Sequence, residues 1–162
     1  MATITALAQA GGTTNATMNW APVPTLYSND IDFAAALALK GSALAANDVI
    51  QAIRYKAGSI IHYAGIQTMV VDDATTLTLD LGITGGDTDA YVDGYDQAAA
   101  AAGAYATMLM DATDLQVNTA AGSIDVLFAT LTGTLAVGKI RVYALITDAN
   151  GIPEPGLAQI RA

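Results

Sequence analysis

The sequence contains no cysteine, a single histidine and a single glutamate. The absence of cysteine excludes disulfide bonds, thiol nucleophiles and thiolate metal sites, and is expected of a protein made in a reducing cytoplasm. The histidine, His62, lies within a long apolar run, where a hydrogen-bonded core or interface histidine is expected rather than a catalytic base. No P-loop and no dinucleotide-binding glycine motif is present. We therefore expect neither an enzyme nor a cofactor.

Positive charge is also scarce, with six lysines and arginines against 15 acidic residues and a formal net charge of -9. An acidic surface repels phosphate backbones, so nucleic-acid binding is not expected. No lysine or arginine precedes Lys40, and no apolar run approaches the length that crosses a bilayer. The composition indicates a soluble protein that is not secreted through its own signal and has no membrane partner.

Proline is missing from the whole middle of the chain, and its four copies lie near the two ends, at Pro22, Pro24, Pro153 and Pro155. Because proline cannot donate to a sheet ladder, this distribution favours a β-rich body with a non-core segment at each end. We expect an extended N-terminal arm over residues 1–29, a β-sandwich body over 30–148 and a C-terminal tail over 149–162.

The arm carries the only tryptophan, Trp20, beside Pro22 and Pro24 and close to Tyr27. A tail that is disordered in isolation and an arm that docks on a neighbouring subunit are both compatible with this composition. A large apolar ring beside extended prolines favours the docking arm. Trp20, Pro22, Pro24 and Tyr27 are therefore the candidate interface residues.

Between the prolines, short apolar or alternating segments are separated by turn residues. Ile31–Lys40 alternates as a half-buried strand does, Ser59–Val71 is apolar on both faces, and Thr76–Ile83 places its leucines on one face. Gly85–Asp96 is expected to be a loop, and the alanine run 98–102 at most one turn of helix. Further strands are expected at about residues 49–56, 104–110, 115–119, 124–131 and 139–147. About eight strands at this spacing predict an all-β fold, an antiparallel β-sandwich or jelly roll.

Four carboxylates in the turn-rich segment 85–96, those of Asp87, Asp89, Asp93 and Asp96, form the only candidate metal site. Calcium requires six to eight oxygen ligands, which such a segment could supply in part. The spacing departs from an EF-hand, since Tyr91 occupies the third acidic position and no glutamate closes the loop. Surface aspartates and a weak calcium site both stay open.

The order of several short motifs carries a resemblance. Asp48-Val49-Ile50 is followed by Lys56-Ala57-Gly58, by Thr78-Leu79-Asp80-Leu81-Gly82, and by Asp89-Ala90-Tyr91-Val92-Asp93-Gly94 with a later Ala-Gly pair and Tyr105. This order resembles small β-sandwich virion proteins of tailed bacteriophages, the capsid decoration or cement proteins. The resemblance implies a homotrimer that binds the major capsid protein on the outer surface of the virion and stabilises the shell by bridging capsomers. The resemblance identifies no functional residue in this sequence.

Two other function classes stay open. One is a phage tail, neck or fibre module, or a carbohydrate-binding β-sandwich used in adsorption, for which Tyr91 and Tyr95 are the only hint if they are exposed. The other is a calcium-dependent adhesive domain of a bacterial surface.

Overall fold

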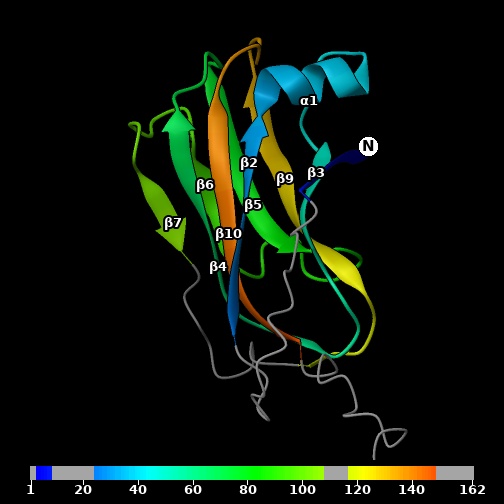
Figure 1. The fold of residues 1–162 in the computed structure, drawn as a ribbon. Coiled ribbons are helices and arrows are strands. Elements are labelled where there is room, and N and C mark those ends of the chain that lie inside the picture. Colours follow the sequence, from blue (N-terminus) through cyan, green and yellow to red (C-terminus); the bar gives the residue numbers. More distant parts are fainter. Residues whose placement is uncertain (1–2, 9–23, 108–116, 149–162) are drawn as a thin grey trace, which may run out of the picture.

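The computed structural model describes residues 3–8, 24–107 and 117–148, which form two packed β-sheets and one short helix (Figure 1). Sheet A has the strand order β1-β3-β9-β5-β6, and sheet B has the order β2-β10-β4-β7, with β8 also paired to β4. The predicted all-β sandwich is confirmed. The elements are β1 (Thr3–Ala8), β2 (Thr25–Asp32), α1 (Phe33–Lys40), β3 (Val49–Tyr55), β4 (Ser59–Val70), β5 (Thr76–Ile83), β6 (Val92–Asp96), β7 (Tyr105–Thr107), β8 (Val117–Asn118), β9 (Gly122–Thr132) and β10 (Lys139–Asp148).

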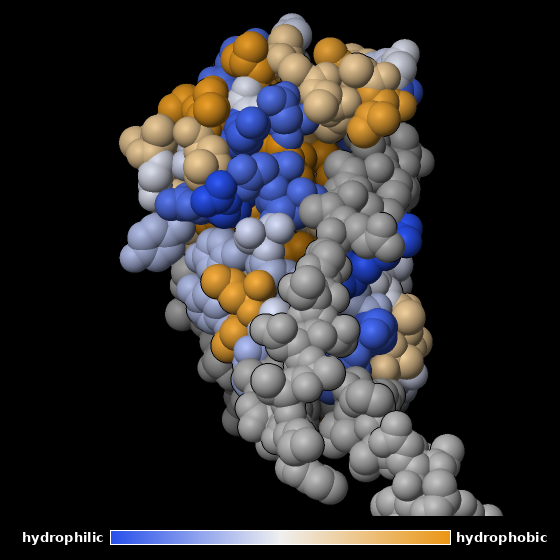
Figure 2. Space-filling model, viewed as in Figure 1, coloured by the Kyte–Doolittle hydropathy of each residue, from blue (hydrophilic) through white to orange (hydrophobic). Residues whose placement is uncertain are grey.

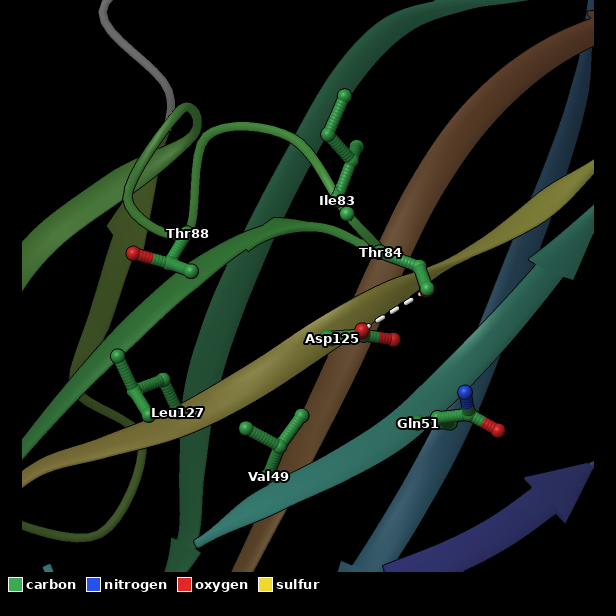
Figure 3. Close-up of a pocket in the computed structure, with 8 residues that line it drawn as sticks. Val49, Gln51, Ile83, Thr84, Thr88, Asp125 and Leu127 are labelled. Carbon is green, nitrogen blue, oxygen red and sulfur yellow. Dashed lines mark hydrogen bonds between the residues drawn. The ribbon is translucent and has the colours of Figure 1, made fainter. Parts of the chain in front are cut away.

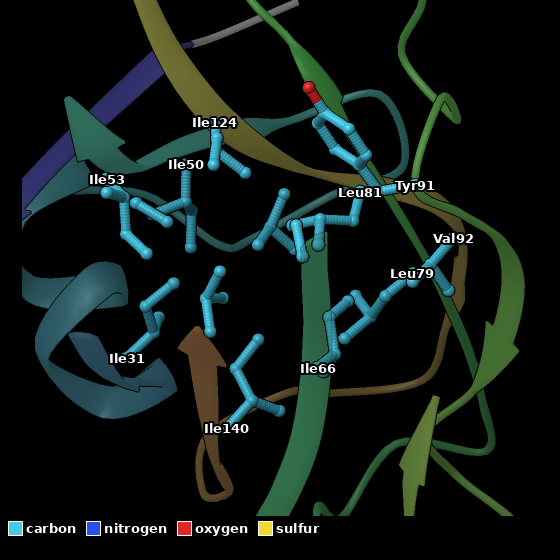
Figure 4. Packing of buried hydrophobic residues seen from close by; sticks show 14 of the residues in the cluster. Ile31, Ile50, Ile53, Ile66, Leu79, Leu81, Tyr91, Val92, Ile124 and Ile140 are labelled. Carbon is cyan, nitrogen blue, oxygen red and sulfur yellow. The ribbon is translucent and has the colours of Figure 1, made fainter. Parts of the chain in front are cut away.

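The core lies between the two sheets, and its side chains come from the alternating positions that the sequence predicts. In β5 these are Leu77, Leu79 and Leu81, and in β10 they are Ile140, Val142, Ala144 and Ile146, all of them buried. Figure 4 shows side chains of both sheets pointing toward one another, among them Ile50, Ile66, Leu81, Ile124 and Ile140. The period-two patterns were therefore a sound guide to the inner faces of these strands.

The predicted strand Ile31–Lys40 is wrong beyond Asp32, because the chain turns there into α1. The Asp32 carboxylate accepts hydrogen bonds from the backbone N–H groups of Ala34, at 2.9 Å, and Ala35, at 3.3 Å, as an N-cap does. The alanines and leucines that follow favour a helix, and Gly41 closes it with a φ of 71°. Phe33 is consequently buried, whereas Leu39 is exposed.

The predicted loop Gly85–Asp96 is wrong over its last five residues, which form strand β6 against β5. The pairing is interrupted between Leu79 and Leu81, where Gly94 has a φ of 67° and donates its N–H to the carboxylate of Asp80 at 2.8 Å. Because a bulge of this kind uses a glycine with positive φ, a strand that contains it resembles a turn in composition. Tyr91 is buried and Tyr95 is half-buried. The two tyrosines therefore do not form the exposed pair that would have indicated glycan binding.

The segment predicted as an arm contributes one edge strand to each sheet. β1 pairs with β3 in parallel, which is the only parallel pairing among the described residues, and β2 pairs with β10. The predicted boundary at residue 29 therefore falls inside β2. Trp20 and Pro22 lie outside the described residues, as do 149–162. Of the two strands predicted at 104–110 and 115–119, residues 108–110 and 115–116 also lie outside, while β7 and β8 form within the described parts.

The alanine run 98–102 forms no helix, in agreement with its prediction as one turn at most. No helix among the described residues is long and apolar enough to cross a membrane.

Candidate interaction surfaces

His62 holds two strands together. It is the extra residue of a β-bulge, because Leu145 pairs with Tyr63 and Ile146 pairs with Ile61. Its Nε2 atom lies 2.7 Å from the Oγ1 atom of Thr147 on β10. This is the hydrogen-bonded structural histidine expected from the sequence.

The four aspartates of the candidate calcium site do not gather around one point. Asp89 donates its N–H to the carboxylate of Asp87 at 3.5 Å, and the nearby Asp87 carboxyl raises the pKa of Asp89. Asp96 instead accepts a hydrogen bond from Ala99 N–H, opposite Thr78 at the far end of β6. Within residues 3–8, 24–107 and 117–148, no group of three or more acidic or histidine side chains could hold a metal ion.

The solvent-facing side of sheet B carries an aromatic and apolar surface, which we call the sheet B face. It consists of the outward residues of four neighbouring strands, Leu26, Tyr63, Tyr105, Tyr143 and Leu145. Leu26 and Tyr105 are 67% and 68% exposed. In Figure 2 the lower part of this face shows an apolar group surrounded by weakly polar surface. Tyrosine is enriched at protein–protein interfaces relative to the rest of the protein surface.

The charges on the sheet B face neutralise one another. Arg141 donates to both carboxylate oxygens of Asp30, at 2.6 and 2.9 Å, and the nitrogen Nζ of Lys139 lies 3.8 Å from Asp32. The hydrogen bonds from the Arg141 guanidinium lower the pKa of Asp30. Because these charges already have partners, a second protein could cover this face without leaving either charge of a pair unpaired.

The tyrosines of the sheet B face lie close against the sheet. A Cβ atom on Gly65 would lie 2.6 Å from the Oη atom of Tyr143, so this glycine provides the space for the ring. The rings of Tyr63 and Tyr143 are 5.7 Å apart, and burial together with the neighbouring hydroxyl of Tyr63 raises the pKa of Tyr143. Tyr63 and Tyr143 of the sheet B face are therefore packed against each other and against the sheet.

A second group of exposed apolar residues lies at the end of the sandwich where α1 is found (Figure 1). It consists of Leu39 of α1, Val70 and Val71 at the end of β4, and Val137 in the loop between β9 and β10. The Phe33 N–H donates to the carbonyl of Gly138 at 3.0 Å, which fixes that loop beside α1.

The opposite side of the molecule, the outer face of sheet A, has a pocket of about 160 Å³ (Figure 3). Its walls come from β3, β9 and the end of β5 with the loop that follows, and comprise Val49, Gln51, Ile83, Thr84, Gly85, Thr88, Asp125 and Leu127. The loop lies directly on the strand, because a Cβ atom on Gly82 would collide with the backbone of Asp87 and Thr88. We call this the sheet A pocket.

One carboxylate lies in the sheet A pocket. Asp125 accepts a hydrogen bond from the Ser123 hydroxyl at 2.5 Å and another from the Thr84 hydroxyl at 2.8 Å. Burial raises the pKa of Asp125. No motif in the sequence marks these residues, because the pocket joins segments that lie far apart in the chain.

The pKa shifts predict that mild acid stabilises this protein. Burial raises the pKa values of Asp72, Asp80 and Asp125. Their folded forms bind protons before the unfolded chain does, so the free energy of unfolding rises as pH falls through the raised values. Asp30 and Asp73 have lowered pKa values and contribute stability that is lost only below about pH 4. Urea unfolding should therefore show greater stability at about pH 5 than at about pH 8.

The Asp125→Asn variant is the control for this pH effect. It removes one of the raised carboxyls and should reduce the rise in stability between the two pH values. A free energy of unfolding that falls steadily on acidification from neutral pH would contradict the expectation.

No protein-family model matches the sequence, and no curated protein matches it at a significant level. The fold itself is found in three capsid structures. A chain of the capsid of Ralstonia phage GP4 is 17% identical with a TM-score of 0.60, over 82% of this chain and 89% of that one. A chain of the acidic stable capsid of Helicobacter pylori bacteriophage KHP30 is 13% identical with a TM-score of 0.56, over 78% of this chain and 89% of that one. A chain of the cyanophage Pam1 capsid asymmetric unit is 19% identical with a TM-score of 0.56, over 86% of this chain and 99% of that one. At these identities the likeness establishes a shared fold.

Proposed function

We propose that this protein is a structural component of a bacteriophage virion, and specifically a decoration protein bound to the outside of the capsid. The observation that carries the proposal is the shared fold with chains of three phage capsids. Each match spans most of both chains, so the neighbours are close to this chain in length. The likeness is therefore to small whole chains and not to one domain of a much larger shell subunit.

The charge of the chain supports a position on the outer surface. Packaged DNA fills the inside of a phage head, and a subunit with a net charge of -9 would be repelled from it. On the outside, the same charge keeps the free protein soluble before it binds.

The sheet B face supports the way in which the protein binds. Its exposed leucine and tyrosine side chains offer apolar area, and its charges are already paired within the chain. We propose that this face lies on the shell and spans the seam between neighbouring copies of the major capsid protein. Burying apolar area across a seam opposes the separation of capsomers under internal pressure.

The remaining parts of the proposal concern assembly. We propose a homotrimer in which the segment with Trp20, Pro22, Pro24 and Tyr27 contacts a neighbouring subunit. Pro24 is exposed and directly precedes β2, the edge strand of sheet B, and Tyr27 packs partly against the core.

The experiment is a binding assay with expanded phage shells that were assembled without this protein. The purified full-length chain should sediment with the shells, saturate at a fixed ratio to the major capsid protein and raise the temperature at which the shells break. Unexpanded shells serve as the control. Failure to sediment with expanded shells at saturating concentration would refute the decoration role.

A further inference from the structure

We propose that the sheet A pocket receives the side chain of a basic residue, a lysine or an arginine, from a neighbouring protein subunit. The inference rests on the proposed function only for the identity of that subunit. The pocket lies on the opposite side of the sandwich from the sheet B face, so it would serve a second contact, with a protein that lies beside this one on the shell.

The walls of the pocket fit the carbon chain of such a residue. Val49, Ile83 and Leu127 supply apolar surface, and Gly85 and Thr88 of the loop also line the pocket. Lysine and arginine bury three or four methylene groups along apolar surface while their charged ends stay near water or a partner. A short polar side chain would leave this apolar lining uncovered.

The charge in the pocket fits the other end of the residue. Each oxygen of Asp125 accepts one hydroxyl hydrogen bond, and a carboxylate oxygen has room for a second. Gln51 pairs with Asp125 across the strands and also lines the pocket. A carboxylate and an amide oxygen together can accept from an ammonium or a guanidinium group.

No cation of the described part of the chain neutralises Asp125. The ion pairs found there use Lys40, Lys56, Lys139 and Arg141, each with a different aspartate. Arg54 is exposed, and no ion pair joins it to Asp125. A partly buried carboxylate that lacks a cation favours a partner that brings one, and the acidic character of the whole chain strengthens this preference.

The test is a titration of the full-length protein followed by amide chemical shifts in NMR. The probes are N-acetyl-lysine methylamide, N-acetyl-arginine methylamide and, as an uncharged probe of similar length, N-acetyl-norleucine methylamide, all at constant ionic strength. The two charged probes should give saturable shifts at the amides of Gln51, Thr84 and Asp125. Norleucine should bind about fivefold more weakly or not at all, as expected for the loss of one partly exposed ion pair.

Two variants and one control complete the design. Asp125→Asn should reduce the affinity for the lysine probe to that for the norleucine probe. Leu127→Trp should block the pocket while the Asp125 carboxylate remains. Asp93→Asn makes the same change of charge at an exposed site of sheet A and should leave binding unaltered. Unchanged shifts elsewhere in the spectrum verify that each variant is folded.

Equal binding of the norleucine probe, unchanged lysine binding by Asp125→Asn, or shifts spread evenly over the acidic surface would each overturn the proposal. So would the absence of any shift. Because no capsid is used, these outcomes are independent of the shell-binding assay. A protein that binds shells but none of the probes would refute the pocket assignment alone.

Discussion

Replacing Phe128 with alanine is expected to lower the free energy of unfolding by about 3–5 kcal/mol, the usual cost of emptying a large aromatic site in a core. Phe128 is 0% exposed, and its ring meets that of Phe33 edge to face at 5.7 Å. The pair joins the start of α1 to the centre of β9, so the cavity would loosen the helix as well as the sheet. Domains of this size have only about 5–15 kcal/mol in total, which makes the loss a large fraction of the whole.

The measurement is urea unfolding followed by far-ultraviolet circular dichroism. Leu39→Ala is the control, because it also truncates an apolar side chain but at a position that is 67% exposed. It should change the free energy of unfolding by less than about 0.5 kcal/mol. A loss below about 1 kcal/mol for Phe128→Ala would show that the two sheets do not pack around this ring as described.

Replacing Leu26 with aspartate is expected to weaken binding to expanded shells by about thirtyfold or more, while the protein stays folded. Leu26 lies on the edge strand β2, opposite Leu145, and is 67% exposed, so the free protein tolerates a charge there. On the shell the new carboxylate would be buried without a partner, which costs roughly 2 kcal/mol or more. Sedimentation with expanded shells over a range of protein concentrations measures the change.

Leu39→Asp is the matched control, with the same substitution at the same exposed fraction but on α1. It should bind shells as the unaltered protein does. If Leu39→Asp lost binding and Leu26→Asp retained it, the shell would lie against the end of the sandwich that carries α1, and our assignment of the sheet B face would be wrong.

The inner faces of the strands could be predicted from the sequence because burial imposes a strict period of two. Thr76–Ile83 and Lys139–Thr147 show this plainly, and their alternate residues are buried. The period of two failed at Phe33–Lys40, where alanine and leucine occur at both helical and strand spacings. The capping residues Asp32 and Gly41 would have identified the helix, since one precedes the run and the other follows it.

The candidate surfaces could be predicted far less well. The sheet B face depends on which strands are neighbours, and β2, β10, β4 and β7 are not consecutive in the chain. The sheet A pocket depends on the pairing of Gln51 with Asp125 and on a loop that lies over Gly82. Local composition carries no information on such pairings. The fold shared with chains of phage capsids agrees with the predicted resemblance to β-sandwich virion proteins, and the decoration role stays a prediction.

The most direct test of the central claim is the number of copies of this chain in purified virions, counted by quantitative mass spectrometry against the major capsid protein. Our account predicts hundreds of copies in a fixed ratio to that protein, all of them removable or cleavable from outside an intact, DNA-filled head. A dozen copies or fewer, or a full complement that is protected inside the head, would contradict it.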